Sequence, residues 1–253
     1  MLNLFRRYCT RAALILVASL MFAAKCGDAN LTVSPGHAFF ESPVGDSKTV
    51  TFTVTNSGTE AAMLGPITQQ GLELLEPFSV AGGTCATGGT VAGNGGTCTL
   101  VLAFSPLVSG VHNGRFVVTY NWEGSGVDVR GAVGALEANA LGLIAPQVFF
   151  PEMAVGQRRI ETATLTNPSR FAARIEGIAP PYLPHVGFRL VGGTCARGFV
   201  LPARGGTCTV LVEYVPLVVG PLDAYSGFTY RWVGPETMDG GFVLFLSHRG
   251  FDP

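Results

Sequence analysis

Charged residues are scarce in this sequence: they make up 13% of its 253 residues, and only two of them are lysines. Beyond residue 29 there are 12 Lys and Arg against 16 Asp and Glu, which gives a net charge of −4. No basic stripe remains there to follow a phosphate backbone. We therefore expect no nucleic-acid partner.

Long hydrophobic runs are also missing. A helix that spans a bilayer needs about twenty apolar residues, whereas the apolar segment Ala12–Ala24 is shorter and lies between Arg11 and Lys25. A basic start, a short apolar stretch and then small residues are typical of an export signal. We predict a signal peptide over residues 1–29 and no stable membrane insertion after its removal.

Cleavage of this signal is expected after Ala29, with Gly27 as the second small residue, or after Cys26. Two other readings stay open: an uncleaved anchor, and lipid attachment at Cys26. A lipid-attachment motif has a small residue before the cysteine, and Lys25 stands there instead. The sequence therefore leaves the state of the N-terminus undecided.

Helical periodicity is absent beyond the signal, and the 34 glycines and 16 prolines suit short strands joined by turns. Residues 48–56 (KTVTFTVTN) alternate strictly between apolar residues and threonine or another polar residue. Residues 98–104 (CTLVLAF) and 115–120 (RFVVTY) follow the same pattern, which predicts half-buried β-strands and an all-β fold. The residues expected to face inward are Val50, Phe52, Val54, Leu100, Leu102, Phe104, Phe116, Val118 and Tyr120, with Val210, Val212, Tyr214, Phe228 and Tyr230 as later counterparts.

The sequence repeats itself after 110 residues. GGTCATGGTVAGNGGTCTLVLAFSPLVSG (82–110) aligns without a gap with GGTCARGFVLPARGGTCTVLVEYVPLVVG (192–220), and Phe39-Phe40 corresponds to Phe149-Phe150. This period is too long for a solenoid unit and fits a β-sandwich of about 100 residues. The sequence therefore predicts two copies of one domain.

The expected architecture is two tandem immunoglobulin-like β-sandwich domains after the N-terminal signal peptide. The first repeat is placed at residues 30–138 and the second at residues 139–253. The small residues of GALEANALG, at 134–142, are typical of a short linker between independently folded halves.

Each repeat carries one ordered pattern: a Phe, a Gly-Thr-Cys, a glycine-rich loop, a second Cys-Thr, an alternating strand, an aromatic-x-Pro and a Gly. The pattern falls on Phe78, Cys85, Cys98, Phe104, Pro106 and Gly110, and again on Phe188, Cys195, Cys208, Tyr214, Pro216 and Gly220. It resembles the choice-of-anchor D type of immunoglobulin-like domain, a group related to the hydin-type and pilus-chaperone-like sandwiches. The resemblance implies exported or surface-attached bacterial modules without a known catalytic site.

Two cysteines bracket the glycine-rich loop of each repeat. A phosphate-binding loop would lead into a helix, but an alternating strand follows Cys98. A zinc site would have closely spaced ligand pairs and further Cys or His nearby, and twelve residues separate the cysteines here. In an exported chain this spacing favours one disulfide per repeat, which we predict as Cys85–Cys98 and Cys195–Cys208.

Catalytic and metal-binding motifs are missing as well. The sequence has neither G-x-S-x-G nor H-E-x-x-H, and its four histidines fall at unrelated positions of the two repeats. A secreted hydrolase is therefore disfavoured. We expect no catalytic residues, no cofactor and no metal.

Four residues are candidates for an interaction surface. Trp122 and Trp232 hold matching repeat positions and suit either an aromatic platform or packing at a strand end. Arg158 and Arg159 belong to arginines that only the second repeat carries, so the repeats have net charges of −5 and +1. Drift between the copies explains this asymmetry, and charge-steered head-to-tail self-association is the alternative.

The expected function is that of an exported, non-enzymatic structural or protein-interaction module, periplasmic or extracellular in a bacterium, whose protein partner the sequence does not identify. The alternative is a periplasmic chaperone that assists assembly of surface fibres by strand donation. Strand 115–120 separates the two hypotheses. In an interaction module its apolar face belongs to its own core, whereas a chaperone would donate it to a client.

Overall fold

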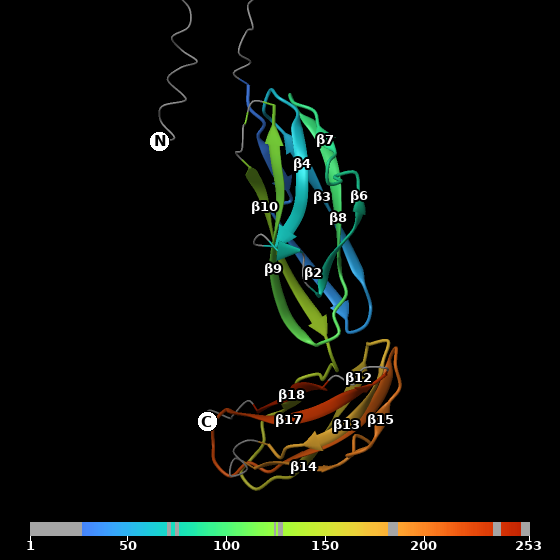
Figure 1. The fold of residues 1–253 in the computed structure, drawn as a ribbon. Helices are drawn as coiled ribbons and strands as arrows, with labels where there is room; N and C mark the ends of the chain where they lie inside the picture. The colour runs from blue at the N-terminus through green and yellow to red at the C-terminus, as the bar shows by residue number, and fades with distance from the viewer. Residues whose placement is uncertain are drawn as a thin grey trace, which may run out of the picture.

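The computed structural model describes residues 27–69, 72–73, 76–123, 125, 129–181, 187–234 and 239–248. Two β-sandwiches follow one another along the chain and lie end to end (Figure 1). Residues 1–26 of the predicted signal peptide lie outside the described residues. The described part contains no helix, and the all-β prediction is confirmed.

The first sandwich has two sheets. Their orders are β1-β3-β8-β6 and β2-β10-β9-β4-β5, and β7 also pairs with β4. Strand β2 runs parallel to β10, and the other pairs are antiparallel. The strands are β1 (Leu31–Ser34), β2 (His37–Pro43), β3 (Lys48–Asn56), β4 (Ala62–Gln69), β5 (Leu72–Glu73), β6 (Phe78–Gly83), β7 (Thr90–Val91), β8 (Gly96–Phe104), β9 (Gly110–Trp122) and β10 (Arg130–Leu141).

The second sandwich follows the same plan with fewer strands. Its sheets have the orders β11-β18-β17-β13-β15 and β12-β16-β14, and β11 is parallel to β18 as β2 is to β10. The strands are β11 (Val148–Phe150), β12 (Arg159–Asn167), β13 (Ala172–Ile178), β14 (Phe188–Gly192), β15 (Val200–Leu201), β16 (Gly206–Tyr214), β17 (Leu222–Val233) and β18 (Asp239–His248).

The core of each sandwich is made by the residues predicted to face inward. In the first, Phe52 of β3 and Phe116 of β9 come from opposite sheets, and their ring centroids lie 4.8 Å apart in a T-shaped pair. Both are fully buried, whereas Val50 is only half-buried. The predicted inward residues of β16 and β17 are buried in the second core. Alternation along the strands therefore identifies both cores.

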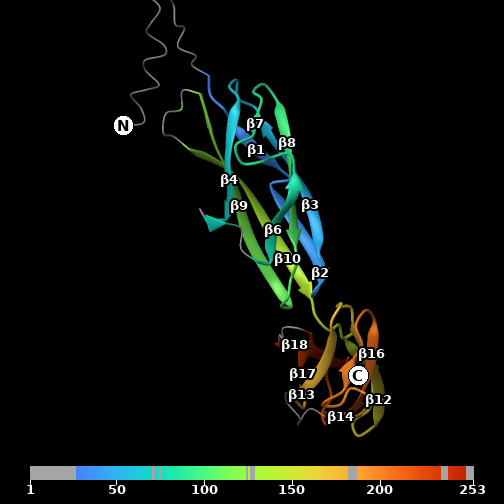
Figure 2. The same ribbon diagram turned by 45° about the vertical axis from the view of Figure 1, so that its right-hand side comes forward.

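The segment predicted as a linker is a strand. Residues 134–141 belong to β10, which pairs with β9 on one side and with β2 on the other. Ala138 and Ala140 are buried, so the small residues face the core of the first sandwich. The connection lies between Leu141 and Val148, and the ends of β2 and β10 lie next to the second sandwich (Figure 2).

Candidate functional site

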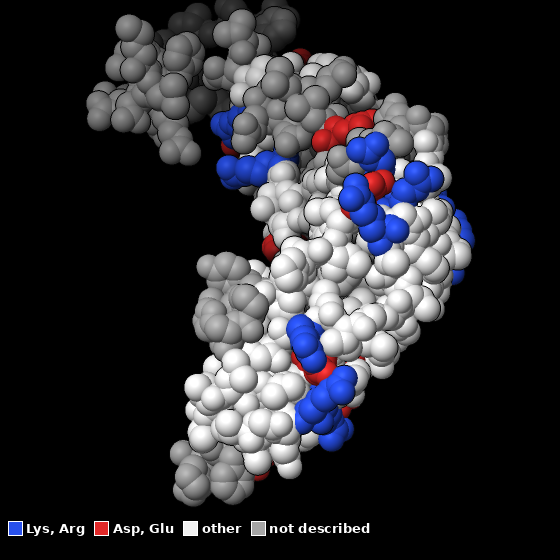
Figure 3. Space-filling model, turned by 90° about the horizontal axis from the view of Figure 1, so that it is seen from below, with Lys and Arg blue, Asp and Glu red and all other residues white. Residues whose placement is uncertain are grey.

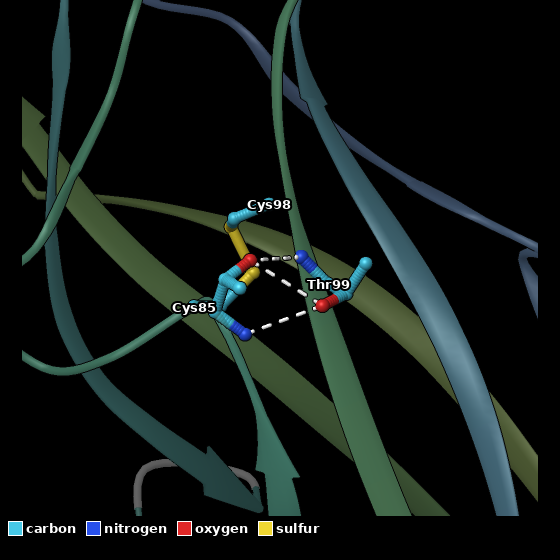
Figure 4. Close-up of a disulfide and its surroundings, with 4 residues drawn as sticks. Cys85, Cys98 and Thr99 are labelled. Atoms are coloured by element: carbon cyan, nitrogen blue, oxygen red, sulfur yellow. Dashed lines mark hydrogen bonds between the residues drawn. A yellow bond between two sulfur atoms is a disulfide. The ribbon is translucent and has the colours of Figure 1, made fainter.

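Each glycine-rich loop is closed by its predicted disulfide. Cys85 is bonded to Cys98, and Cys195 to Cys208, with Cα atoms 5.1 Å apart in both pairs. Beside the first bond, the Thr99 amide donates to Thr84 Oγ1 at 2.9 Å (Figure 4). The bond therefore joins the end of β6 to the neighbouring strand β8 of the same sheet.

The glycine that begins each Gly-Thr-Cys turn is required by this close approach. Gly83 has a φ of +111°, and a Cβ there would lie 2.2 Å from the carbonyl oxygen of Thr99. Gly193 has a φ of +116° and the same 2.2 Å separation from Thr209. Only glycine fits such a position, so backbone geometry explains the motif without a bound ligand.

A groove of about 500 Å³ lies beside the first disulfide. Pro66 and Ile67 of β4 line one side, and Val80 and Gly82 of β6 line the other. The described lining holds apolar and hydroxyl groups but no ionisable side chain. This groove offers surface for contact rather than groups for acid–base chemistry.

The two tryptophans have different environments despite their matching positions. Trp122 is half-buried, and the guanidinium of Arg130 lies over its ring, 4.4 Å from the centroid. Trp232 is only 2% exposed and packs against Tyr230 with ring centroids 4.9 Å apart. The prediction that Trp232 lies on an interaction surface is therefore corrected: its ring is part of the second core.

Arg158 belongs to a charged cluster on the outer face of the second sandwich. Its guanidinium and that of Arg189 both donate to the carboxylate of Glu213, which they cover completely. The hydrogen bond from Arg189 lowers the pKa of Glu213, Arg158 acts in the same direction, and burial opposes them. Arg159 instead pairs with Glu161 on its own strand. Figure 3, which views the molecule from below, shows charged side chains gathered in small groups separated by uncharged surface.

The predicted interaction residues do not form one site. Trp122 ends β9 at the end of the first sandwich that is remote from the second. Arg158 and Arg159 lie at the start of β12, whose other end approaches the first sandwich through Ser169. These residues therefore lie near opposite ends of the molecule.

Strand β9 pairs with β10 over residues 110–120 and with β4 within residues 117–122. It lies between β10 and β4, and Phe116, Val118 and Tyr120 are buried in its own sandwich. A strand with both hydrogen-bonding edges occupied cannot be added to another sheet. Residues 117–120 of the strand predicted at 115–120, which lie between two paired neighbours, are therefore not available for donation to a client.

Two exposed phenylalanines lie on edge strands and were not singled out as surface residues from the sequence. Phe39 is 54% exposed on β2, and Phe149 is 60% exposed on β11. Each precedes a buried phenylalanine, Phe40 or Phe150. Successive side chains of a strand point to opposite faces, so the Phe-Phe pairs already indicated that one ring of each faces outward.

The two sandwiches contact each other through a small set of polar and aromatic groups. Ser169 Oγ donates to the carbonyl oxygen of Val44 at 2.7 Å. The Tyr230 hydroxyl accepts from the amide of Leu143 and donates to Ser109 Oγ, at 3.4 Å each. Burial raises the pKa of Tyr230, so this hydroxyl keeps its proton. These contacts fix how the first sandwich meets the second.

Neither a metal centre nor a membrane helix occurs in the described part. No three His, Cys, Asp or Glu side chains there are grouped as metal ligands. The described residues also form no helix that is long and apolar enough to cross a bilayer.

The sheets define an immunoglobulin-like β-sandwich protein. Residues 29–132 match the family model of the HYDIN/CFA65/VesB-like, Ig-like domain. This match supports an immunoglobulin-like family for the first sandwich and does not extend over the second. No curated protein matches the chain.

Solved structures with a similar fold include a protease and two chaperones. The VesB protease of Vibrio cholerae is 20% identical with a TM-score of 0.36, over 45% of this chain and 32% of the VesB chain. The E. coli chaperone DraB is 11% identical with a TM-score of 0.34, over 85% and 97% of the two chains. The Pseudomonas aeruginosa CupB2 chaperone is 13% identical with a TM-score of 0.32, over 84% and 99%. This chain thus spans about a third of the VesB chain.

Proposed function

We propose that this protein is an exported, non-enzymatic immunoglobulin-like module that binds a protein partner along the edges of its sheets. The observation that carries this proposal is the pair of exposed phenylalanines, Phe39 and Phe149, on edge strands at matching positions. The disulfides support export, because such bonds persist mainly in oxidising compartments.

Strand β2 is well suited to accept an added strand. It has seven residues, and its only sheet neighbour in the described part is β10. Its outward side chains, His37, Phe39 and Glu41, alternate with buried ones. An extended partner segment would use the free backbone groups for affinity and the exposed ring for specificity. This arrangement supports accepting a strand rather than donating β9.

The two sandwiches are proposed to be tandem copies of a choice-of-anchor D type domain. The cysteine pairs have the same separation of 13 residues, and β2 and β11 make equivalent parallel pairs. Duplication would give one chain two similar edges. A partner with two equivalent segments would then gain avidity from binding both.

The test uses the full chain as bait on an extract of the native cell envelope. Phe39→Asp and Phe149→Asp place a charge on each edge, singly and together, while Val133→Asp alters a side chain that is 45% exposed on the interior strand β10. We expect wild type and Val133→Asp to retain a common protein partner and the double edge variant to lose it. Equal capture by all four variants would overturn edge binding.

A further inference from the structure

The same turn occurs at corresponding ends of the two sandwiches. In the first, the Gly45 amide donates to the carbonyl oxygen of Pro106 at 2.7 Å. In the second, the Gly156 amide donates to that of Pro216 at 2.9 Å. The two glycines have φ values of +84° and +81°. Val44 and Val155, the residues before them, therefore hold equivalent positions.

The second sandwich covers this turn in the first. Val44 is fully buried, and its carbonyl oxygen accepts the hydrogen bond from Ser169 Oγ. A Cβ built on Gly45 would lie 2.4 Å from the ring of Phe171. The turn thus receives one hydroxyl donor and one aromatic ring from the Ser169–Phe171 segment.

The equivalent turn of the second sandwich is uncovered. Val155 is 53% exposed, and a Cβ on Gly156 would meet no atom within 4 Å. The adjacent loop adds three large apolar side chains, at 52%, 54% and 68% exposure: Leu217, Val218 and Val219. Contiguous exposed apolar side chains of this kind mark interaction sites.

We infer that this end of the second sandwich, formed by Val155, Gly156 and Leu217–Val219, is a docking surface for the end of another immunoglobulin-like domain. The occupant brings a serine or threonine hydroxyl to the Val155 carbonyl and an aromatic ring over Gly156, as Ser169 and Phe171 do for Val44 and Gly45. The surface is distinct from the β2 and β11 edges, so this inference goes beyond the proposed edge binding.

The occupant is not the first sandwich of a second copy. At the end of the first sandwich, Gly58 and Glu60 stand where the second has Ser169 and Phe171. The corresponding amides confirm the alignment, because Gly58 and Ser169 each donate to the buried asparagine two residues earlier. A side chain at Gly58 would lie 2.2 Å from the carbonyl oxygen of Asp28. That end therefore lacks the hydroxyl and the ring and is covered by its own backbone, so the occupant is an immunoglobulin-like domain other than this first sandwich.

The test adds to the full chain a domain whose end is known to carry the required hydroxyl and aromatic ring. A second copy of residues 142–253 is fused after Pro253, so that its Ser169 and Phe171 can reach the free turn. Val155→Cys in the original second sandwich then reports exposure through its rate of reaction with a maleimide. We expect the added copy to lower this reaction rate at least tenfold, towards the slow rate of Val44→Cys in the unfused chain. The rate should recover when the added copy carries Phe171→Ala.

Two controls keep the outcome interpretable. Val133→Cys, on β10 of the first sandwich and away from its contact with the second, should react equally fast with and without the added copy. Phe171→Ala in the unfused chain should speed the reaction of Val44→Cys, which calibrates the existing contact. An unchanged Val155→Cys rate on fusion, or protection that persists with Phe171→Ala in the added copy, would overturn the docking surface. Neither result would bear on binding at the β2 edge.

Discussion

Asn56 and Asn167 hold the same turn in the two sandwiches from positions that water does not reach. Asn56 Nδ2 donates to the carbonyl oxygens of Glu60 and Val91, and its Oδ1 accepts from the amide of Gly58. Asn167 repeats these contacts with Phe171, Leu201 and Ser169. Both side chains are fully buried, so each supplies partners that the backbone of its turn would otherwise lack.

Replacing Asn56 by alanine should lower the free energy of unfolding by about 3 kcal/mol, because several buried backbone groups lose their partner at once. Thr49→Ala, on the exposed face of β3, is the matched control and should stay within about 0.5 kcal/mol of wild type. Urea unfolding of the oxidised protein measures both. Equal stabilities of the two variants would contradict the role assigned to Asn56.

Removing the first disulfide as Cys85→Ser with Cys98→Ser should cost about 3 kcal/mol, since the bond closes a short loop of the unfolded chain. The cysteines are 13 positions apart. The second pair has the same separation and should give a similar loss. Peptide mapping without reduction should recover each pair within its own sandwich. A peptide linking the two sandwiches would contradict the assignment.

Phe116→Ala should destabilise the protein by about 3–5 kcal/mol, because it leaves a cavity opposite Phe52 in the core. Val117 lies on the other face of β9 and is half-buried. Its replacement by threonine should therefore change the free energy of unfolding by only about 0.5 kcal/mol. Chemical denaturation of the two variants in parallel tests the contrast, which would fail if Val117→Thr proved the more costly change.

The cluster around Glu213 should make the free energy of unfolding depend on pH in the acidic range. Because the pKa of Glu213 is lowered from its ordinary value of 4.5, pairing stabilises the folded state fully above that pH. The stabilisation is lost as the pH falls below 4.5 through the lowered pKa of the folded state. The difference in unfolding free energy between wild type and Glu213→Gln should accordingly shrink in this range. A difference independent of pH would show that the carboxylate charge contributes nothing.

A fragment of residues 27–141 should unfold in one cooperative transition, since both of its sheets are complete. A fragment that stops at residue 138 should have a lower midpoint, because Asn139–Leu141 pair with Glu41–Pro43 and Ala140 is buried. Thermal unfolding under oxidising conditions compares the two. Loss of cooperativity in both would mean that the sandwiches share a core.

The sequence predicted the strands and cysteine pairs well because their signals are local. Strict alternation at Phe52 and Phe116 requires only the geometry of a single strand, and the cysteine spacing repeats within each copy. The segment 134–142 was misjudged because alanine and glycine suit a linker and also a strand packed against neighbouring aromatic rings. Gly134 shows the latter, since a Cβ there would lie 2.3 Å from the Phe116 ring.

The surface was harder to predict because exposure depends on strand order and on the neighbouring domain. Trp122 and Trp232 hold the same position in the repeat, yet only Trp232 is fully covered. The alternation with Phe40 indicates that Phe39 faces outward, but nothing in the local sequence shows that β2 is the outermost strand of its sheet. Val44 is buried and Val155 is exposed because the second sandwich covers the turn of the first. Such features depend on the assembled fold rather than on local pattern.

The position of each disulfide has a mechanical consequence. Because the bond bridges neighbouring strands of one sheet, a force applied through the ends of the chain passes across the sulfurs and bypasses the loop between them. The cysteines are 13 residues apart, so the unfolded chain of either sandwich extends about 40 Å less with the disulfide intact than with it reduced. Pulling single molecules with and without a reductant should therefore show two such increases in unfolded length on reduction, one for each sandwich.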